Sequence, residues 1–299
     1  MRLEKMRQRL QAGEKILIDG ATGTELERRG VPMVEGGWNA GGVLTHPEVV
    51  QQVHEDYIRM GAQIIISNTF STGMFWLRRA GMEDHFEFLN RQGVEIAKAA
   101  RDKMERPDVL IAGGMFITPR EREAGVEPSV SQQNLKRQAQ IFADAGADFI
   151  MLEMMRDIEI TRWAIQAAQQ AGLPVWVGFS CRLDGDGKPN MLHGEVPLAD
   201  YVKAIREEPI EALLVMHTLT EDIDACLDVL QPLWSGPVGV YAHSGKFNPP
   251  NWQFIDMITP EDYAAAAAGW LKRGVQVVGG CCGIGPEHLD ALRRVVDAA

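Results

Sequence analysis

The chain has 299 residues, long for one average domain but ordinary for one α/β barrel. Its 41 acidic and 30 basic side chains give a formal net charge of −11, which argues against nucleic acid and against an acidic membrane surface as partners. No run approaches the roughly 20 apolar residues of a membrane-spanning helix. The charged N-terminus lacks the apolar run of a secretory signal, so we expect a cytoplasmic protein that does not enter a membrane.

Short apolar runs rich in Val and Ile recur along the chain, and each predicts a buried β-strand. They cover residues 15–18, 63–67, 109–113, 148–152, 175–179, 212–216, 237–240 and 275–279. The stretches between them have room for helices, and in 47–61 the apolar residues fall mostly on one helical face. Four glycines stand just before a strand, where a helix is expected to end: Gly61, Gly146, Gly172 and Gly274.

This alternation of strand and helix predicts an α/β protein with the (β/α)8 TIM barrel fold, and residues 1–299 are interpreted as a single domain. An open, doubly wound sheet is the alternative, but no GxGxxG turn follows the first predicted strand. No linker or low-complexity tract divides the chain. The run of five alanines at 264–268 is interpreted as a helix packed closely against the barrel.

The C-terminal ends of barrel strands are where the chemistry of such enzymes takes place. Here those ends carry two carboxylates, two histidines and a pair of adjacent thiols, namely Asp19, Glu153, His217, His243, Cys281 and Cys282. We expect these groups to converge on one rim of the barrel.

Cys281 and Cys282 give the sharpest chemical signal. Thiolates suit Zn²⁺, and adjacent residues can reach one ion where a strand breaks into a loop, as the glycines of GGCCG allow. The alternative is a pair of buried cysteines that act as small apolar residues. A third ligand is needed, and His217 after the sixth strand is best placed. His243 and Cys181 are also candidates, whereas Cys226, among apolar residues of a predicted helix, is interpreted as structural.

Asp19 and Glu153 have two possible roles. They are either helix caps or salt-bridge partners, or they bind the ammonium group of an amino-acid substrate. In the second case the backbone amides of Gly20 and Ala21 would bind its carboxylate.

The sequence resembles the zinc-dependent homocysteine S-methyltransferases, which include the betaine- and S-methylmethionine-dependent enzymes and the homocysteine module of cobalamin-dependent methionine synthase. The resemblance runs nearly end to end. It rests on DGATGTEL at 19–26, HPEVVQQVHEDYIRMGAQIIISNTF at 46–70, DFIMLEM at 148–154, PVWVGFS at 174–180, YAHSG at 241–245 and GGCCGIGPEH at 279–288.

The resemblance implies a function and roles for the site residues. In this family three cysteines bind zinc, the metal holds homocysteine as a thiolate, and the sulfur attacks an activated methyl group to give methionine. Cys281 and Cys282 would then bind Zn²⁺, while Asp19 and Glu153 would bind the amino group of a small-molecule thiol acceptor.

Two departures from the family pattern concern the third ligand and the methyl donor. VMHTLTEDI stands where relatives have Gly-x-Asn-Cys, so His217 takes the place of the first metal cysteine, which makes the net charge of the site more positive by one. Betaine-using relatives surround the donor with aromatic rings, but of those positions only Trp38 is aromatic here, while Thr22, Ser71 and Met154 are not. Betaine is therefore disfavoured relative to a sulfonium donor. The competing hypothesis is a metal-free relative that binds an amino acid or a partner without methyl transfer.

Overall fold

A parallel sheet forms the centre of the molecule. The structure, a computed structural model, describes residues 2–194, 196–248, 253–255 and 257–299. The sheet has eight strands: β1 (Ile16–Leu17), β2 (Ile64–Ile66), β3 (Leu110–Met115), β4 (Phe149–Met155), β5 (Val175–Phe179), β8 (Ala212–Leu219), β9 (Val238–His243) and β12 (Val277–Val278). Each of them overlaps one of the strands predicted from the apolar runs.

The sheet closes on itself between β1 and β2. The strand order is β1-β12-β9-β8-β5-β4-β3-β2, and a parallel bridge between Ile18 and Ile64 joins its two outer strands. The Asp19 N–H also donates to the Ile64 carbonyl at 3.1 Å. The (β/α)8 TIM barrel is therefore confirmed, and the open-sheet alternative is wrong.

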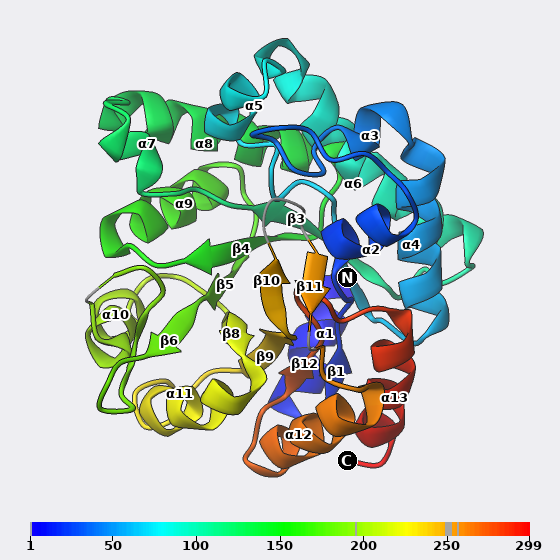
Figure 1. The fold of residues 1–299 in the computed structure, drawn as a ribbon, viewed down its shortest axis with the longest axis vertical. Coiled ribbons are helices and arrows are strands. Elements are labelled where there is room, and N and C mark those ends of the chain that lie inside the picture. Colours follow the sequence, from blue (N-terminus) through cyan, green and yellow to red (C-terminus); the bar gives the residue numbers. More distant parts are fainter. Residues whose placement is uncertain (1, 195, 249–252, 256) are drawn as a thin grey trace.

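Helices surround the barrel (Figure 1). They are α1 (Arg2–Gln11), α2 (Thr22–Arg28), α3 (Gly42–Thr45), α4 (Pro47–Arg59), α5 (Met74–Arg79), α6 (Phe86–Lys103), α7 (Arg120–Glu123), α8 (Pro128–Ala145), α9 (Ile158–Gln170), α10 (Leu198–Ile205), α11 (Ile223–Leu230), α12 (Pro260–Lys272) and α13 (Pro286–Asp297). Their ends follow local chemistry: the Asp157 side chain caps α9 by accepting from the Ile160 N–H, and Gly146 ends α8 with a left-handed φ of 84°.

The core has two compartments, because successive side chains of a strand point to opposite faces. Ile64 and Ile66 point into the barrel, with Met6 and Leu10 of α1 packed in the same cluster. Ile65 instead belongs to the larger cluster between strands and helices. The alanine run lies in α12, where Ala267 is fully buried, as expected for a helix packed closely on its neighbours.

Two hairpins that the sequence did not predict extend from the C-terminal ends of β5 and β9. The first pairs β6 (Cys181–Leu183) with β7 (Pro189–Met191), and the second pairs β10 (Lys246–Asn248) with β11 (Gln253–Ile255). In Figure 1 the second hairpin is drawn in front of the barrel strands. The rim of the barrel is thus built from additional strands as well as from loops.

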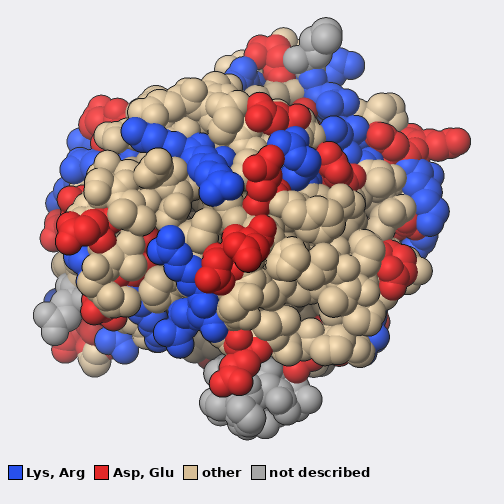
Figure 2. Space-filling model, turned by 90° about the horizontal axis from the view of Figure 1, so that it is seen from above, with Lys and Arg blue, Asp and Glu red and all other residues tan. Residues whose placement is uncertain are grey.

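The surface carries both signs of charge. On the face shown in Figure 2, Lys and Arg side chains are interspersed with Asp and Glu. Within the ranges that the structure describes, no helix is long and apolar enough to span a membrane. The assignment of residues 1–299 to a single domain, and a cytoplasmic location, remain predictions.

Candidate active site

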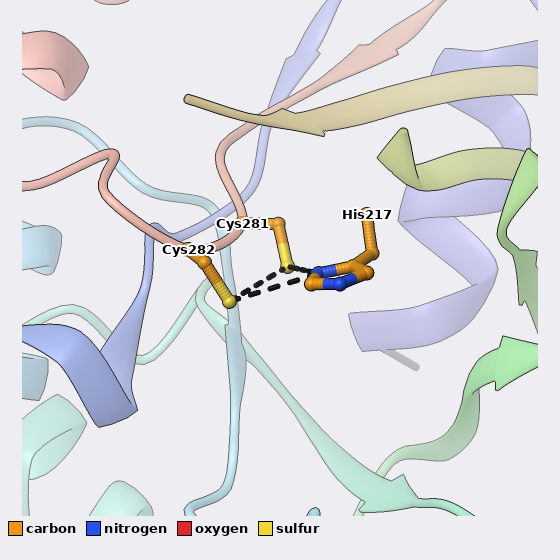
Figure 3. Close-up of side chains that lie close together, drawn as sticks. All are labelled: His217, Cys281 and Cys282. Atoms are coloured by element: carbon orange, nitrogen blue, oxygen red, sulfur yellow. Dashed lines mark hydrogen bonds between the residues drawn. The ribbon is translucent and has the colours of Figure 1, made fainter. Parts of the chain in front are cut away.

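The two cysteines and His217 lie together at the C-terminal end of the barrel. Cys281 Sγ is 3.6 Å from His217 Nδ1, Cys282 Sγ is 3.7 Å from the same nitrogen, and the two sulfurs are 3.8 Å apart. Figure 3 shows the cysteines on one loop, with the imidazole approaching from the opposite side. These three side chains are the group of possible metal ligands found among the described residues.

The size of this triangle fits zinc. With Zn–S bonds of about 2.3 Å and a Zn–N bond of about 2.05 Å, a tetrahedral ion separates two sulfurs by about 3.8 Å and a sulfur from a nitrogen by about 3.6 Å. The three measured separations therefore allow one ion to contact all three atoms at normal bond lengths. Two soft thiols and one imidazole are also ligands that zinc prefers.

The backbone around the triangle departs from regular strand geometry. Cys281 and Cys282 follow β12 in a loop that is attached to β9 by two hydrogen bonds, from Cys281 N–H to Ala242 O and from Ser244 N–H to Cys282 O. His217 has a left-handed φ of 42° at a register shift in β8. Such a conformation in a residue other than glycine costs of order 1–3 kcal/mol and is concentrated at functional sites.

The Cys281 thiol also fits a cation site. A hydrogen bond to Cys282 and burial raise the pKa of the Cys281 thiol well above its ordinary value. This thiol therefore resists ionisation unless a positive charge accompanies it. A divalent ion at the centre of the triangle would provide that charge.

The other candidate ligands lie outside the triangle. The His243 ring is 4.6 Å from the His217 ring, centroid to centroid, at an angle of 45°, and burial lowers the pKa of His243 to about 4. Cys181 is buried beside Cys226 of α11, and a hydrogen bond to that thiol is the main cause of a raised pKa at Cys181. Neither His243 nor Cys181 belongs to the described ligand group, and Cys226 is fully buried, as a structural residue would be.

A cavity of about 140 Å³ extends from the triangle toward β1 and β4. Asp19 and Glu153 line the same cavity and are 2% and 9% exposed. Among the described residues neither carboxyl has an ion-pair partner or caps a helix, so their interpretation as helix caps or salt-bridge partners is wrong. Asp19 Oδ2 accepts the Ile66 N–H at 2.8 Å.

The two carboxyls share an electrostatic environment. Burial raises the pKa of Glu153 to about 8. Burial, and further the charge of Glu153, raise the pKa of Asp19 well above its ordinary value. A bound ammonium group would offset this effect and favour the ionised form of both carboxyls.

One of the two amides predicted to bind the substrate carboxylate is engaged elsewhere. The Ala21 N–H donates to Ile284 O at 3.0 Å, while Ala21 lines the cavity, and its role in binding the substrate carboxylate stays a prediction. Gly20 lies beside it, and no hydrogen bond of its N–H to the described residues is found. Gly20 is tightly packed, since an added Cβ would lie 2.6 Å from Ile284 O.

Trp38 belongs to an aromatic wall that the sequence did not reveal. Its ring lies 5.6 Å from Phe70 and 4.7 Å from Trp76, and the Phe70 ring stacks on Phe116 at 4.4 Å, centroid to centroid. Trp38 and Phe70 line the cavity, as do Thr22 and Met154. The four rings come from the segments before α3, after β2 and after β3, and from α5, and no local sequence pattern connects them.

The family assignment follows from comparison with known proteins. A family model of the homocysteine S-methyltransferases matches residues 16–296. The chain is 26% identical to a selenocysteine methyltransferase of Astragalus bisulcatus, over 96% of this chain and 94% of that protein. It is 27% identical to the homocysteine S-methyltransferase YbgG of Bacillus subtilis, over 93% of each chain.

A solved structure supports the same fold. The metallated form of the homocysteine methyltransferase MmuM from Escherichia coli superposes with a TM-score of 0.79 at 24% identity, covering 98% of this chain and 99% of that one. The match of the family model spans the barrel from β1 into α13. This chain therefore belongs to the homocysteine S-methyltransferase family, whose members are methyltransferases.

Proposed function

We propose that the protein is a zinc-dependent S-methyltransferase that transfers a methyl group from an onium-type donor to the thiol of homocysteine, giving methionine. The observation that supports this most is the triangle of two sulfurs and one imidazole nitrogen, with separations of 3.6–3.8 Å. His217, Cys281 and Cys282 would hold the ion. Three protein ligands leave the fourth tetrahedral position open, which is typical of catalytic zinc sites and not of structural ones.

When bound, zinc would lower the pKa of the substrate thiol, so that a thiolate nucleophile exists at neutral pH without a separate base. In the transfer, the substrate sulfur forms a bond to the methyl carbon while the bond from that carbon to the onium atom breaks. The electron pair of the broken bond leaves with the donor, which becomes neutral at that atom. The thiol proton goes to solvent.

The carboxyl side of the cavity would orient the substrate. Asp19 and Glu153 line the same cavity as the triangle, so an amino-acid thiol can present its sulfur to the metal ligands and its ammonium group to the carboxyls. A hydrogen bond to a charged group contributes roughly 1.5–3 kcal/mol, and the low dielectric of a buried site strengthens it. Gly20, Ala21 and Trp38 would line the part of the cavity that holds the rest of the substrate.

The histidine in the ligand set bears on the choice of donor. A neutral imidazole in place of a thiolate makes the net charge of the site more positive by one. The metal would therefore withdraw more electron density from the substrate sulfur. A weaker nucleophile favours a more reactive methyl donor, such as a sulfonium compound, over a quaternary ammonium compound such as betaine.

Metal content and product analysis test this proposal against the metal-free alternative. Protein purified without chelators should contain about one zinc per chain and should convert homocysteine and S-methylmethionine to methionine. A gently purified protein that contains no zinc, and that binds homocysteine without methylating it, would be the binding protein of the alternative hypothesis instead.

A further inference from the structure

A second cavity adjoins the first at the metal triangle. It has a volume of about 680 Å³ and shares Trp38, Met154 and His217 with the cavity that holds the carboxyls. A molecule bound in it would therefore lie against the imidazole, and Asp19 and Glu153 do not line this cavity. Under the proposed function this is the place for the methyl donor.

Three arginines line this second cavity, each from a different segment of the rim. Arg120 is the first residue of α7, Arg156 follows β4, and Arg182 lies in β6. Arg120 and Arg182 are exposed, and Arg156 is half-buried, with its guanidinium donating to Thr118 Oγ1 at 3.0 Å. All three line the same cavity as His193, whose pKa is lowered by burial and then by the charges of Arg156, Arg120 and Arg182.

None of the three has a carboxylate within 4.0 Å in the ranges that the structure describes, although most described arginines do. Arg122, two residues from Arg120 on the same helix, shows the usual arrangement: it lies 3.0 Å from Glu159 and 3.7 Å from Asp157. Asp222 is the acidic side chain that lines the cavity, and it too has no ion-pair partner among the described residues. The cavity wall therefore carries an excess of uncompensated positive charge.

The cavity has an apolar side as well, formed by Trp38, Trp76 and Phe116. Guanidinium groups bind carboxylates and phosphates through paired hydrogen bonds, whereas a ligand with only positive charge is repelled by the arginines. Aromatic faces attract a cationic methyl-bearing head group. The two surfaces together fit a ligand with an onium head and an acidic tail.

We propose that the second cavity selects a methyl donor of net negative charge, one that carries two or more acidic groups in addition to its onium centre. The acidic groups contact Arg120, Arg156 and Arg182, and the transferable methyl group faces the shared surface formed by Trp38, Met154 and His217. This inference rests on the proposed function for the role of the ligand as a donor. The anion site itself follows from the arginines alone.

A binding experiment tests the anion site without any methyl transfer. Tryptophan fluorescence is followed while tricarballylate, a tricarboxylate, or glycerol 3-phosphate is added at fixed ionic strength, since Trp38 and Trp76 line the cavity. We expect saturable binding, weakened about tenfold or more in each of Arg120→Gln, Arg156→Gln and Arg182→Gln. Arg122→Gln, on the same rim but outside the cavity, should bind like the wild type. Equal affinity in all four variants, or no saturable binding of either anion, overturns the proposal.

A donor series tests the selection. Trimethylsulfonium, a dimethylsulfonium acetate and a dimethylsulfonium succinate carry zero, one and two carboxylates at the same reacting centre. We expect kcat/KM to rise about tenfold with each carboxylate, and the three arginine variants to flatten this rise. Equal kcat/KM for all three donors contradicts the inference and leaves the proposed function intact. Arginine-dependent anion binding in a protein that methylates no thiol supports the anion site and contradicts the proposed function.

Discussion

The two sides of the first cavity are built in different ways. His217, Cys281 and Cys282 are partly exposed and stand where regular backbone breaks, at a register shift in β8 and in the loop after β12. Asp19 and Glu153 are more deeply buried, after β1 and at a register shift in β4, and burial raises the pKa of both. Metal binding thus depends on the distances between three ligand atoms. Recognition of the ammonium group depends instead on carboxyls that are buried away from water.

This difference indicates that the two ends of one substrate are recognised independently. Ligand distances fix where the sulfur can be, and the energetic cost of burying a carboxylate is recovered only when an ammonium group arrives. Variants on one side should therefore leave the other side intact. Four experiments test this separation.

The largest effect is expected at the cysteines. Cys281→Ala or Cys282→Ala should lose stoichiometric zinc and all methyl transfer while the barrel stays folded, because two remaining ligands in a rim loop do not hold the ion. Zinc is measured by elemental analysis and folding by circular dichroism. Cys181→Ala is the matched control, since this thiol lies outside the triangle and should not affect the metal. Full zinc occupancy in either rim variant would refute the metal assignment.

A ligand replacement at His217 should be smaller in effect but more specific. In metal sites, removal of a side chain that only hydrogen-bonds to a ligand lowers metal affinity about 10–100-fold. Removal of a ligand itself, as in His217→Ala, should weaken zinc binding by at least that much. His217→Cys should retain the ion in a site of three thiolates. His243→Ala, a neighbouring ring outside the described ligand group, is the control and should bind zinc normally. If His217→Ala binds zinc as the wild type does, the third ligand is another group.

On the carboxyl side, Glu153→Gln or Asp19→Asn should keep zinc but raise KM for homocysteine. Loss of a charged hydrogen bond of roughly 1.5–3 kcal/mol corresponds to about a 10- to 150-fold increase. Glu121→Gln is the control, because Glu121 also has a pKa raised by burial but bonds to Ser131 and does not line the cavity. An unchanged KM in both cavity variants would show that the carboxyls do not contact the substrate.

The smallest effect is a pH dependence of stability in protein stripped of metal and ligand. The pKa of Glu153 is about 8 in the folded protein and near its ordinary 4.5 when unfolded, so between these values the folded state holds a proton that the unfolded chain has lost. This stabilisation is complete below pH 4.5 and is lost as the pH rises to about 8, by at most about 1.4 kcal/mol per pH unit. Urea unfolding from pH 5 to 8 should show a flatter decline in Glu153→Gln, and parallel curves would contradict the buried-carboxyl assignment.

The sequence predicted the barrel and the metal triangle because both leave local signals. A buried parallel strand appears as a short Val- and Ile-rich run, and GGCCG joins two thiols to glycines at a strand end. His217 was placed by its position after the sixth strand, and it lies within 3.7 Å of both sulfurs.

The rest of the rim could not be predicted in the same way. Arg120, Arg156 and Arg182 are far apart in the chain and meet only because parallel strands end at the same edge. The same holds for Trp76 and Phe116. The engagement of the Ala21 amide by Ile284 is a contact between the two ends of the chain, which no local pattern reports.

The closure of the barrel has a consequence for its dynamics. The seam between β1 and β2 includes a bridge at Ile18–Ile64, the bond from Asp19 N–H to Ile64 O, and the bond from Ile66 N–H to the Asp19 carboxyl group at 2.8 Å. The Asp19 side chain, which is proposed to bind the substrate ammonium group, thus also stabilises the contact between β1 and β2. We expect a bound amino acid to slow hydrogen–deuterium exchange at the Ile66 and Asp19 amides more than at amides of β5. A bound substrate would then stabilise the closed barrel. The seam between β1 and β2 would open most readily in the ligand-free protein, between turnovers.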